Sequence, residues 1–169
     1  EHEYLEAIVE VVDDPVRREA RYEAIFRDLI EWRRTLGTGS KIVCFLTDPD
    51  SAADLYRNLE EVFGHFDIAE VLTSEGVEAR AERIARFEAD PQAWLLVCGR
   101  EAEEGVNLQF AHAIFHVDIP LSVERLEQRI GRLDRFGRRI SGIHHRVLLP
   151  SDDEESPWNI WVALLLNGF

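Results

Sequence analysis

The chain has 169 residues and a formal net charge of -14 at pH 7, because 33 acidic residues face 19 basic ones. This length suits one domain with a sizeable core, and the acidic balance argues against a domain whose whole surface binds DNA nonspecifically. No apolar run reaches the roughly 20 residues of a membrane helix, and no basic stretch typical of a signal peptide opens the chain. Both cysteines lie in apolar runs. We therefore expect a cytoplasmic protein without membrane contact or disulfides.

Predicted helices and strands alternate along the chain. Residues 13–36 have helical spacing, with Pro15 in the first helical position, and the glycine-rich run 37–40 ends this helix. The next helix is expected at 48–64, where Asp50 or Ser51 would cap its start. Later helices are expected at 77–90, 122–137 and from 157 onward. Short apolar runs typical of buried strands occupy residues 41–47, 66–73, 93–99, 112–119 and 143–150.

This alternation predicts an α/β fold with a parallel sheet covered by helices on both faces. In such sheets the chemistry lies at the carboxyl ends of the strands. The turns after Thr47, Thr73, Cys98 and Ile119 are therefore the places where functional residues are expected.

Two patterns resemble known sites but fail on context. The run "GTGSK" at residues 37–41 lacks the spacing of a phosphate-binding loop, and it ends a helix and opens a strand, the reverse of that motif. His112 and His116 have the four-residue spacing of zinc ligands on a helix, but they flank a predicted strand and no Cys or carboxylate pattern completes a site. The sequence predicts no metal site.

An arginine-rich helix at 122–137 is the most informative segment. On a helical wheel Val123, Leu126, Ile130, Leu133 and Gly137 fall within about 80° of one another and predict the core face. A second sector of about 80°, nearly opposite, carries Arg125, Gln128, Arg132 and Arg135. Ser122 is expected to cap the helix.

The function of this arginine stripe has two interpretations from the pattern alone. One is a solvated face with salt bridges to the plentiful acids. The other is recognition of phosphate or carboxylate, because all the bases are arginine, whose planar fork binds such oxygens, and no acid stands at i,i+4 on the stripe. Gly131 costs about 1 kcal/mol inside a helix, which a close approach of another surface would explain.

The motif Gln128-x-x-Gly131-Arg132-x-x-Arg135 resembles motif VI of superfamily 2 helicases. The fuller string "LEQRIGRLDRFG" is similar to the Swi/Snf-related ATPases, especially their bacterial RapA-like branch. Residues 98–111, "CGREAEEGVNLQFA", resemble motif V of that branch, and "KIVCFLTDPDSAADLYRNL" resembles its motif IV. Four motifs, counting Arg80 ahead of Phe87, occur in order across residues 41–150.

This resemblance implies the second RecA-like lobe of a helicase-type ATPase: a three-layer parallel sheet with helices on both faces and flanking N- and C-terminal helices. It divides the chain into a helical lead-in at 1–36, the lobe at 37–150, and an acidic loop with the start of a brace-type helix at 151–169. The first lobe of such enzymes carries the Walker motifs, and it is expected in the parent protein because this chain does not begin with Met and lacks a Walker A motif.

The resemblance also implies roles for individual residues. Arg135 is expected to be the primary arginine finger on the γ-phosphate of ATP, with Arg132 as its partner and Gln128 near the phosphates or the attacking water. Gly105, Asn107 and Gly131 are expected beside the nucleotide. ATP and Mg²⁺ would be bound mainly by the first lobe.

The expected nucleic-acid contacts are Thr47, Thr73, Ser74, Arg100 and Arg80, although Arg80 is equally well interpreted as a surface residue. The implied partners are the first lobe, double-stranded DNA and a transcription or DNA-processing complex, in a bacterial cytoplasm near the nucleoid. The resemblance implies directional translocation on duplex DNA. Two alternatives stay open: a non-catalytic module that binds an acidic protein partner through the arginine stripe, and a helicase that separates DNA or RNA strands.

Overall fold

Five parallel strands form one sheet in the order β2-β3-β1-β4-β5 in the computed structural model of the protein. The structure describes residues 15–64, 68–71, 76–135, 142–149 and 157–167. The strands are β1 (Ile42–Phe45), β2 (Ile68–Val71), β3 (Leu95–Cys98), β4 (Ala113–His116) and β5 (His144–Val147). Each strand lies inside a run predicted from the sequence, and the α/β fold with a parallel sheet is confirmed.

The chain divides into two compact units, Glu1–Thr38 and Gly39–Phe169. The first unit contributes α2 (Pro15–Leu36), within which the rings of Tyr22 and Phe26 stack with centroids 6.3 Å apart. Every other described element belongs to the second unit.

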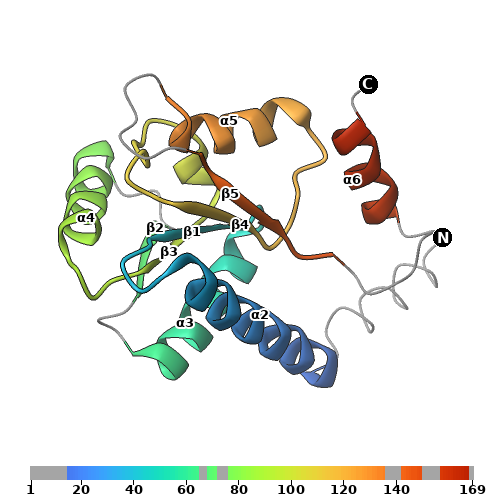
Figure 1. The fold of residues 1–169 in the computed structure, drawn as a ribbon, viewed down its shortest axis with the longest axis horizontal. Coiled ribbons are helices and arrows are strands. Elements are labelled where there is room, and N and C mark those ends of the chain that lie inside the picture. The colour runs from blue at the N-terminus through green and yellow to red at the C-terminus, as the bar shows by residue number, and fades with distance from the viewer. Residues whose placement is uncertain (1–14, 65–67, 72–75, 136–141, 150–156, 168–169) are drawn as a thin grey trace. The chain divides into compact units, whose positions relative to one another are not determined.

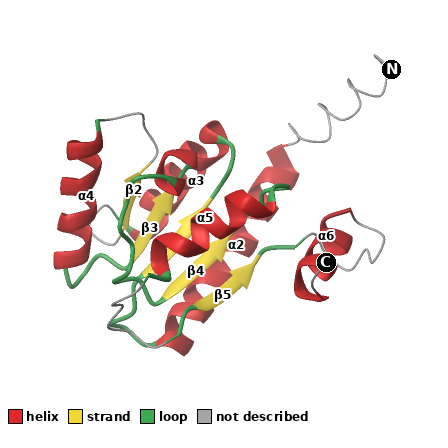
Figure 2. Cartoon of the chain, turned by 90° about the horizontal axis from the view of Figure 1, so that it is seen from above, coloured by secondary structure: helices red, strands yellow, loops and turns green. Residues whose placement is uncertain are grey.

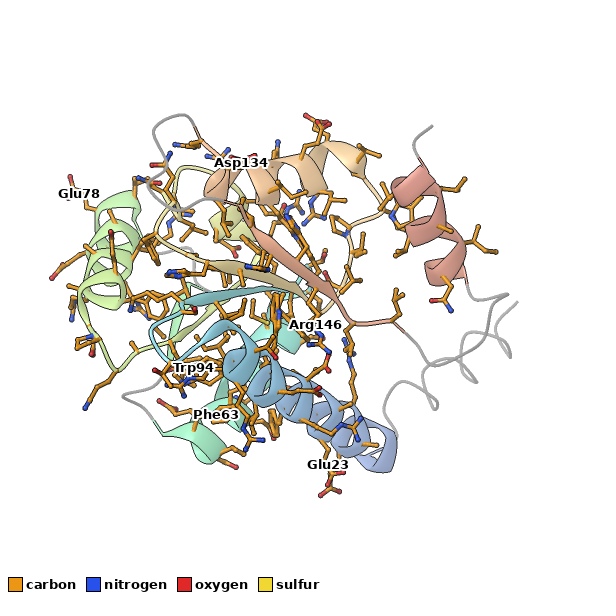
Figure 3. The ribbon with its side chains drawn as sticks, in the orientation of Figure 1. Glu23, Phe63, Glu78, Trp94, Asp134 and Arg146 are labelled. Carbon is orange, nitrogen blue, oxygen red and sulfur yellow. The ribbon has the colours of Figure 1, made fainter. Side chains whose placement is uncertain are left out.

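Helices cover both faces of the sheet, as Figures 1 and 2 show for α5 (Val123–Leu133) on one face and α3 (Pro49–Phe63) on the other. The face toward α5 also carries α4 (Val77–Ala89), because Phe87 of α4 and Leu133 of α5 share one core cluster with Val43 and Phe45 of β1. On α3, Phe63 meets Trp94 edge to face at 5.2 Å, a contact labelled in Figure 3. The short 3₁₀ helix η1 (Arg100–Glu103) follows β3, and α6 (Pro157–Asn167) closes the described chain.

Two helix boundaries differ from the predictions. Helix α3 is capped by Asp48, whose carboxylate accepts the N–H of Ser51 at 2.8 Å, so the expectation of Asp50 or Ser51 as the cap was wrong. Helix α5 begins after Ser122 as predicted, but it ends at Leu133 with Asp134 as its C-terminal cap instead of running to residue 137. Asp134 is labelled at that end of α5 in Figure 3.

Lys41, the only lysine of the chain, closes the C-terminal end of α4. Its ammonium donates to the carbonyl oxygens of Phe87, Asp90 and Ala93 at 2.6–2.7 Å and lies 4.5 Å from the centroid of the Phe87 ring. Helix C-termini leave carbonyl groups without intrahelical partners, so this cation satisfies three acceptors at once. Lys41 therefore fixes the turn between α4 and β3 to the start of β1.

Candidate functional site

The central strands β3, β1 and β4 are neighbours in the sheet, so the residues that follow them meet at one edge. Thr47 follows β1, Asp118 follows β4 and Glu103 ends η1 after β3. Helix α5 lies above this edge and sends Arg125 and Arg129 toward it. The result is a network of two arginines, two carboxylates and one hydroxyl.

Arg129 is the centre of the network and is fully buried. Its Nε donates to Glu103 Oε1 at 2.8 Å, and its Nη2 donates to Thr47 Oγ1 at 2.8 Å and to Asp118 Oδ1 at 3.3 Å. Its Nη1 donates to the carbonyl oxygen of Asp118 at 2.8 Å and to Oδ1 at 3.3 Å. A guanidinium has five N–H groups, and all five have acceptors here, which is the condition under which a buried charge is tolerated.

Glu103 is the carboxylate that holds two arginines. It is 2% exposed, and it accepts Nε and Nη2 of Arg125 at 2.8 Å each in addition to the bond from Arg129. Its hydrogen bonds raise the pKa of the Arg125 guanidinium. The sequence shows no acid at i,i+4 on the stripe, and the acidic partner of Arg125 comes instead from η1, which is distant in sequence. For Arg125, the interpretation of the stripe as a salt-bridged face is therefore the one that applies.

Thr47 completes the network at the tip of β1. Its hydroxyl donates to Asp118 Oδ1 at 2.8 Å while accepting from Arg129, and its backbone N–H donates to Asp118 Oδ2 at 2.7 Å. Both the hydroxyl and the backbone N–H of Thr47, a predicted nucleic-acid contact, are thus engaged in hydrogen bonds within the domain. Thr73 and Ser74, also predicted to contact nucleic acid, lie outside the described residues.

Arg132 and Arg135 differ sharply from Arg125 and Arg129. The Nε of Arg132 donates to the carbonyl oxygen of Gln128 at 3.3 Å, and the Nε of Arg135 donates to that of Gly131 at 3.2 Å. Within the part of the chain that the structure describes, no carboxylate pairs with either guanidinium. Arg132 is half-buried in the last turn of α5, and Arg135 is exposed just beyond its cap.

The segment after η1 runs beside the C-terminal end of α5. The backbone N–H of Leu108 donates to the carbonyl oxygen of Arg132 at 3.0 Å, which places the neighbouring Asn107 next to that turn. Asn107 is exposed, and its Oδ1 accepts the N–H of Gln109 at 3.2 Å. Gly105 is exposed and has a φ of 73°, a left-handed conformation that favours glycine.

Gly131 presents an open surface in the last turns of α5. A Cβ atom built at this position would meet no heavy atom within 4 Å, so nothing in the described lobe requires glycine there. The structure thus brings Gly131, Arg132 and Asn107 to one end of α5.

A cavity of about 480 Å³ lies at the other end of α5, between α4, η1 and the first turns of the helix. Arg80, Arg100 and Gln128, three of the predicted site residues, line it. The remaining lining residues are Glu101, Glu103, Glu104, Glu124 and Arg125. Arg80 donates through Nη1 to the carbonyl oxygen of Glu101 at 2.7 Å, which attaches α4 to η1.

Gln128 is therefore grouped with Arg80 and Arg100 in the cavity wall, while the two predicted fingers lie toward the end of the same helix. Arg80, Arg100 and Gln128 thus lie at one end of α5, and Gly131, Arg132, Arg135 and Asn107 lie at the other, whereas Thr47 belongs to the buried network. The cavity carries both signs of charge, with three arginines among four glutamates. The described residues include no group of three or more potential metal ligands.

Arg129 is the functional residue that sequence reasoning missed. One signal was present: on a helical wheel it stands about 40° from Leu133, at the edge of the predicted core sector. An arginine is normally assigned to the solvent face, and only the carboxylates of Glu103 and Asp118 make its burial possible.

Buried titratable groups near the network are held neutral. Burial raises the pKa of the Cys44 and Cys98 thiols well above their usual range, so neither is a reactive thiolate. Burial, together with the nearby charge of Arg129 and with His145, lowers the pKa of His116 to about 3. The His116 ring stacks on His145 with centroids 6.0 Å apart.

Comparisons with known proteins agree on one family. Residues 23–137 match the family model of the helicase conserved C-terminal domain. The chain is 36% identical over 132 residues to the RNA polymerase-associated protein RapA of Pseudomonas aeruginosa (strain LESB58), an alignment that covers 76% of this chain and 14% of that protein. It is 32% identical over 133 residues to RapA of Pseudomonas fluorescens (strain Pf0-1), again covering 14% of the relative.

Two solved structures share the fold. The C-terminal part of the Fun30 ATPase domain superposes with a TM-score of 0.64 at 16% identity, covering 75% of this chain and 41% of that one. Domain 2 of the DEAD-box helicase Mss116p, solved bound to an RNA duplex, gives a TM-score of 0.61 at 19% identity, covering 76% and 50%. Within the described ranges no helix is both long and apolar enough to cross a membrane.

Proposed function

The chain belongs to the helicase conserved C-terminal domain family, and from this premise we propose that it is the second motor lobe of an ATP-dependent DNA translocase of the RapA-like type. The chain spans only 14% of the length of the curated relatives it matches, so the first lobe is taken to lie elsewhere in a parent protein. ATP binds between the two lobes in this proposal. This lobe contributes Arg132 and Arg135 to the hydrolysis of the γ-phosphate.

The observation that carries the proposal is the contrast between paired and unpaired guanidiniums on one helix. Arg125 and Arg129 are neutralised by Glu103 and Asp118. Among the described residues, Arg132 and Arg135 bond only to backbone carbonyls of their own helix, although the chain has a net charge of -14. A cation that has no counter-ion among the described residues of an acidic chain is suited to an anion supplied from outside.

The two arginines fit a polyphosphate. Phosphoryl transfer spreads negative charge over the γ-phosphoryl oxygens, so fixed cations stabilise the transition state more than the ground state. A Cβ atom at Gly131 or at Gly105 would meet no heavy atom within 4 Å, so a nucleotide or an opposing lobe can approach the backbone at both positions. ATP would supply the reactive phosphoanhydride and Mg²⁺ would neutralise part of its charge, whereas Arg132 and Arg135 would supply positive charge from this lobe. Closure of the lobes would exclude bulk water from the site.

The nucleic-acid contacts are proposed at the cavity between α4, η1 and α5. Arg80 and Arg100, two of the predicted nucleic-acid contacts, provide charge there. Gln128 was predicted near the ATP phosphates, but because it lines the same cavity we propose that its amide contacts nucleic acid instead. The acidic residues in the same wall limit the attraction for phosphate, which suits contact along one edge better than tight binding by this lobe alone. We propose duplex DNA as the track and a transcription complex as the target, the latter because the relatives are named RNA polymerase-associated proteins.

The test of the proposed function is the ATPase activity of the parent protein carrying Arg135→Ala. Loss of an arginine finger is expected to lower kcat by about 10³-fold or more, and Arg132→Ala is expected to act in the same direction. Arg86→Ala is the matched control, because Arg86 forms an exposed ion pair with Glu82 on α4 and does not line the cavity.

The competing explanation is that Arg132 and Arg135 only stabilise the helix C-terminus. In that case Arg135→Ala would change stability slightly and leave ATPase activity at the wild-type level, which refutes the proposal. A triplex-displacement assay beside a fork-unwinding assay then separates translocation from strand separation. Robust ATP hydrolysis by the 169-residue chain alone would also contradict the assignment.

A further inference from the structure

Helix α5 is joined to the segment after β3 at both of its ends. At its start, Nε and Nη2 of Arg125 donate to the carboxylate of Glu103 at 2.8 Å each. At its far end, the N–H of Leu108 donates to the carbonyl oxygen of Arg132 at 3.0 Å. Since Glu103 and Leu108 belong to one short irregular segment, residues 103–108, the segment and the helix are held together at two separate points.

The junction at Glu103 is the stronger of the two. Its carboxylate is buried and receives a bidentate, charge-assisted pair from Arg125 as well as a bond from fully buried Arg129. Arg129 extends the junction to Asp118 and Thr47 at the tips of β4 and β1. A displacement of η1 therefore cannot occur without displacing α5 or breaking a buried ion pair.

This same segment forms a wall of the cavity. Glu101, Glu103 and Glu104 line it from η1 and the residue that follows, and Arg125 lines it from α5. Both residues of the Glu103–Arg125 pair therefore line the cavity, and a ligand that fills it would lie against them. The proposed fingers lie beyond this pair, toward the C-terminal end of the same helix.

We propose that Arg125 and Glu103 are positioning residues that couple nucleic-acid occupancy of the cavity to the placement of Arg132 and Arg135. The inference rests on the proposed function and adds a route within the lobe. The ligand contacts η1, and the Glu103–Arg125 pair transmits the position of η1 to the first turn of α5. The rigid helix then carries this displacement to Arg132 and Arg135. Neither residue touches the nucleotide in this scheme.

The experiment uses the parent protein carrying Arg125→Met, which removes the pair and keeps an apolar stem. The values of kcat and KM for ATP are measured with and without a blunt duplex DNA, below the thermal unfolding temperature of each variant. The DNA-stimulated kcat is expected to fall about tenfold or more, because small misplacements of catalytic groups are costly, while the KM for ATP changes less than about twofold. Arg86→Met breaks the exposed Arg86–Glu82 pair and is the control expected to keep wild-type stimulation.

Arg125→Lys provides a second measurement if the Met variant does not fold. Lysine retains the charge but cannot form two parallel bonds to Glu103, so a stimulated kcat between those of the wild type and of a folded Glu103→Gln variant is expected. Wild-type stimulation in a folded Arg125→Met or Arg125→Lys variant overturns the inference. An unchanged kcat with a raised KM for ATP overturns it as well.

Failure of this inference is distinguishable from failure of the proposed function. If Arg135→Ala abolishes ATP hydrolysis while folded Arg125→Met behaves as wild type, the proposed role of the arginine fingers is supported and only the coupling route is wrong. If Arg135→Ala retains full ATPase activity, both the proposed function and the coupling route that depends on it are wrong.

Discussion

Substitution of Gly131 by alanine separates what the lobe needs for folding from what it needs for function. Gly131 lies in the last turns of α5, and its added Cβ would meet no atom of the described lobe. Alanine is favoured over glycine in a helix by about 0.5–1 kcal/mol. Gly131→Ala is therefore expected to stabilise this chain by that amount, which raises Tm by about 2–4 °C per kcal/mol for a chain of this size.

The same change is expected to impair the parent enzyme. If the first lobe and its nucleotide close onto the open surface at Gly131, the methyl group enters a contact that exists only in the closed state. We expect ATPase kcat/KM to fall about tenfold, which corresponds to about 1.4 kcal/mol of lost transition-state stabilisation. The assay pairs thermal unfolding of the 169-residue chain with steady-state ATPase kinetics of the parent protein.

Glu127→Ala is the control for both measurements, because Glu127 is an exposed residue of the same helix. Two results would refute the reasoning about Gly131. A lower Tm would mean that the helix surface at Gly131 is not open in the folded lobe. A higher Tm with unchanged kcat/KM would mean that no partner approaches there, and glycine at this position would then have no functional explanation.

Two further predictions concern groups outside the arginine helix. Lys41→Met leaves three carbonyl oxygens without their cationic donor and should lower the free energy of unfolding by about 2 kcal/mol. Urea denaturation measures this change, and an unchanged unfolding midpoint would contradict the role assigned to Lys41. The pKa of His116 is about 3 in the folded protein and 6.5 for the free side chain. Between pH 3 and pH 6.5 the unfolded chain therefore binds one proton at His116 that the folded protein does not bind. The free energy of unfolding consequently falls as the pH drops through 6.5. His116→Phe should remove about 1.4 kcal/mol of the stability difference between pH 8 and pH 5.5, and an equal pH dependence in both proteins would refute this assignment.

The order of helices and strands was predictable because buried parallel strands require continuous apolar runs. Residues 42–45 and 95–98 are buried throughout, and the sequence shows this directly. The end of α5 was less predictable, because Arg135 continues the arginine sector and Gly137 the core sector of the helical wheel beyond Leu133. Asp134 ends the helix, with its own N–H bonded to the carbonyl oxygen of Ile130.

The face of α5 that meets the sheet could not be predicted from apolar periodicity. Val123, Leu126 and Ile130 were expected in the core and are only half-buried, whereas Arg129 and Leu133 are buried. The helix is rotated toward its arginine side. The acceptors that permit this rotation lie far away in the sequence, such as Thr47, which is 82 positions before Arg129, and no local pattern reports such a separation.

The rotation of α5 also decides which arginines remain available. Buried charges are tolerated only when they are paired, so the carboxylates at the strand tips neutralise the guanidiniums that point inward. Among the described residues, no carboxylate pairs with Arg132 or Arg135. Positive charge is thus held at one end of a helix whose other end is locked by ion pairs, and such fixed, pre-oriented charge is what stabilises a transition state without reorganisation during the reaction. In the proposed function, the buried network would therefore supply the rigidity that Arg132 and Arg135, unpaired among the described residues, require to act on the nucleotide.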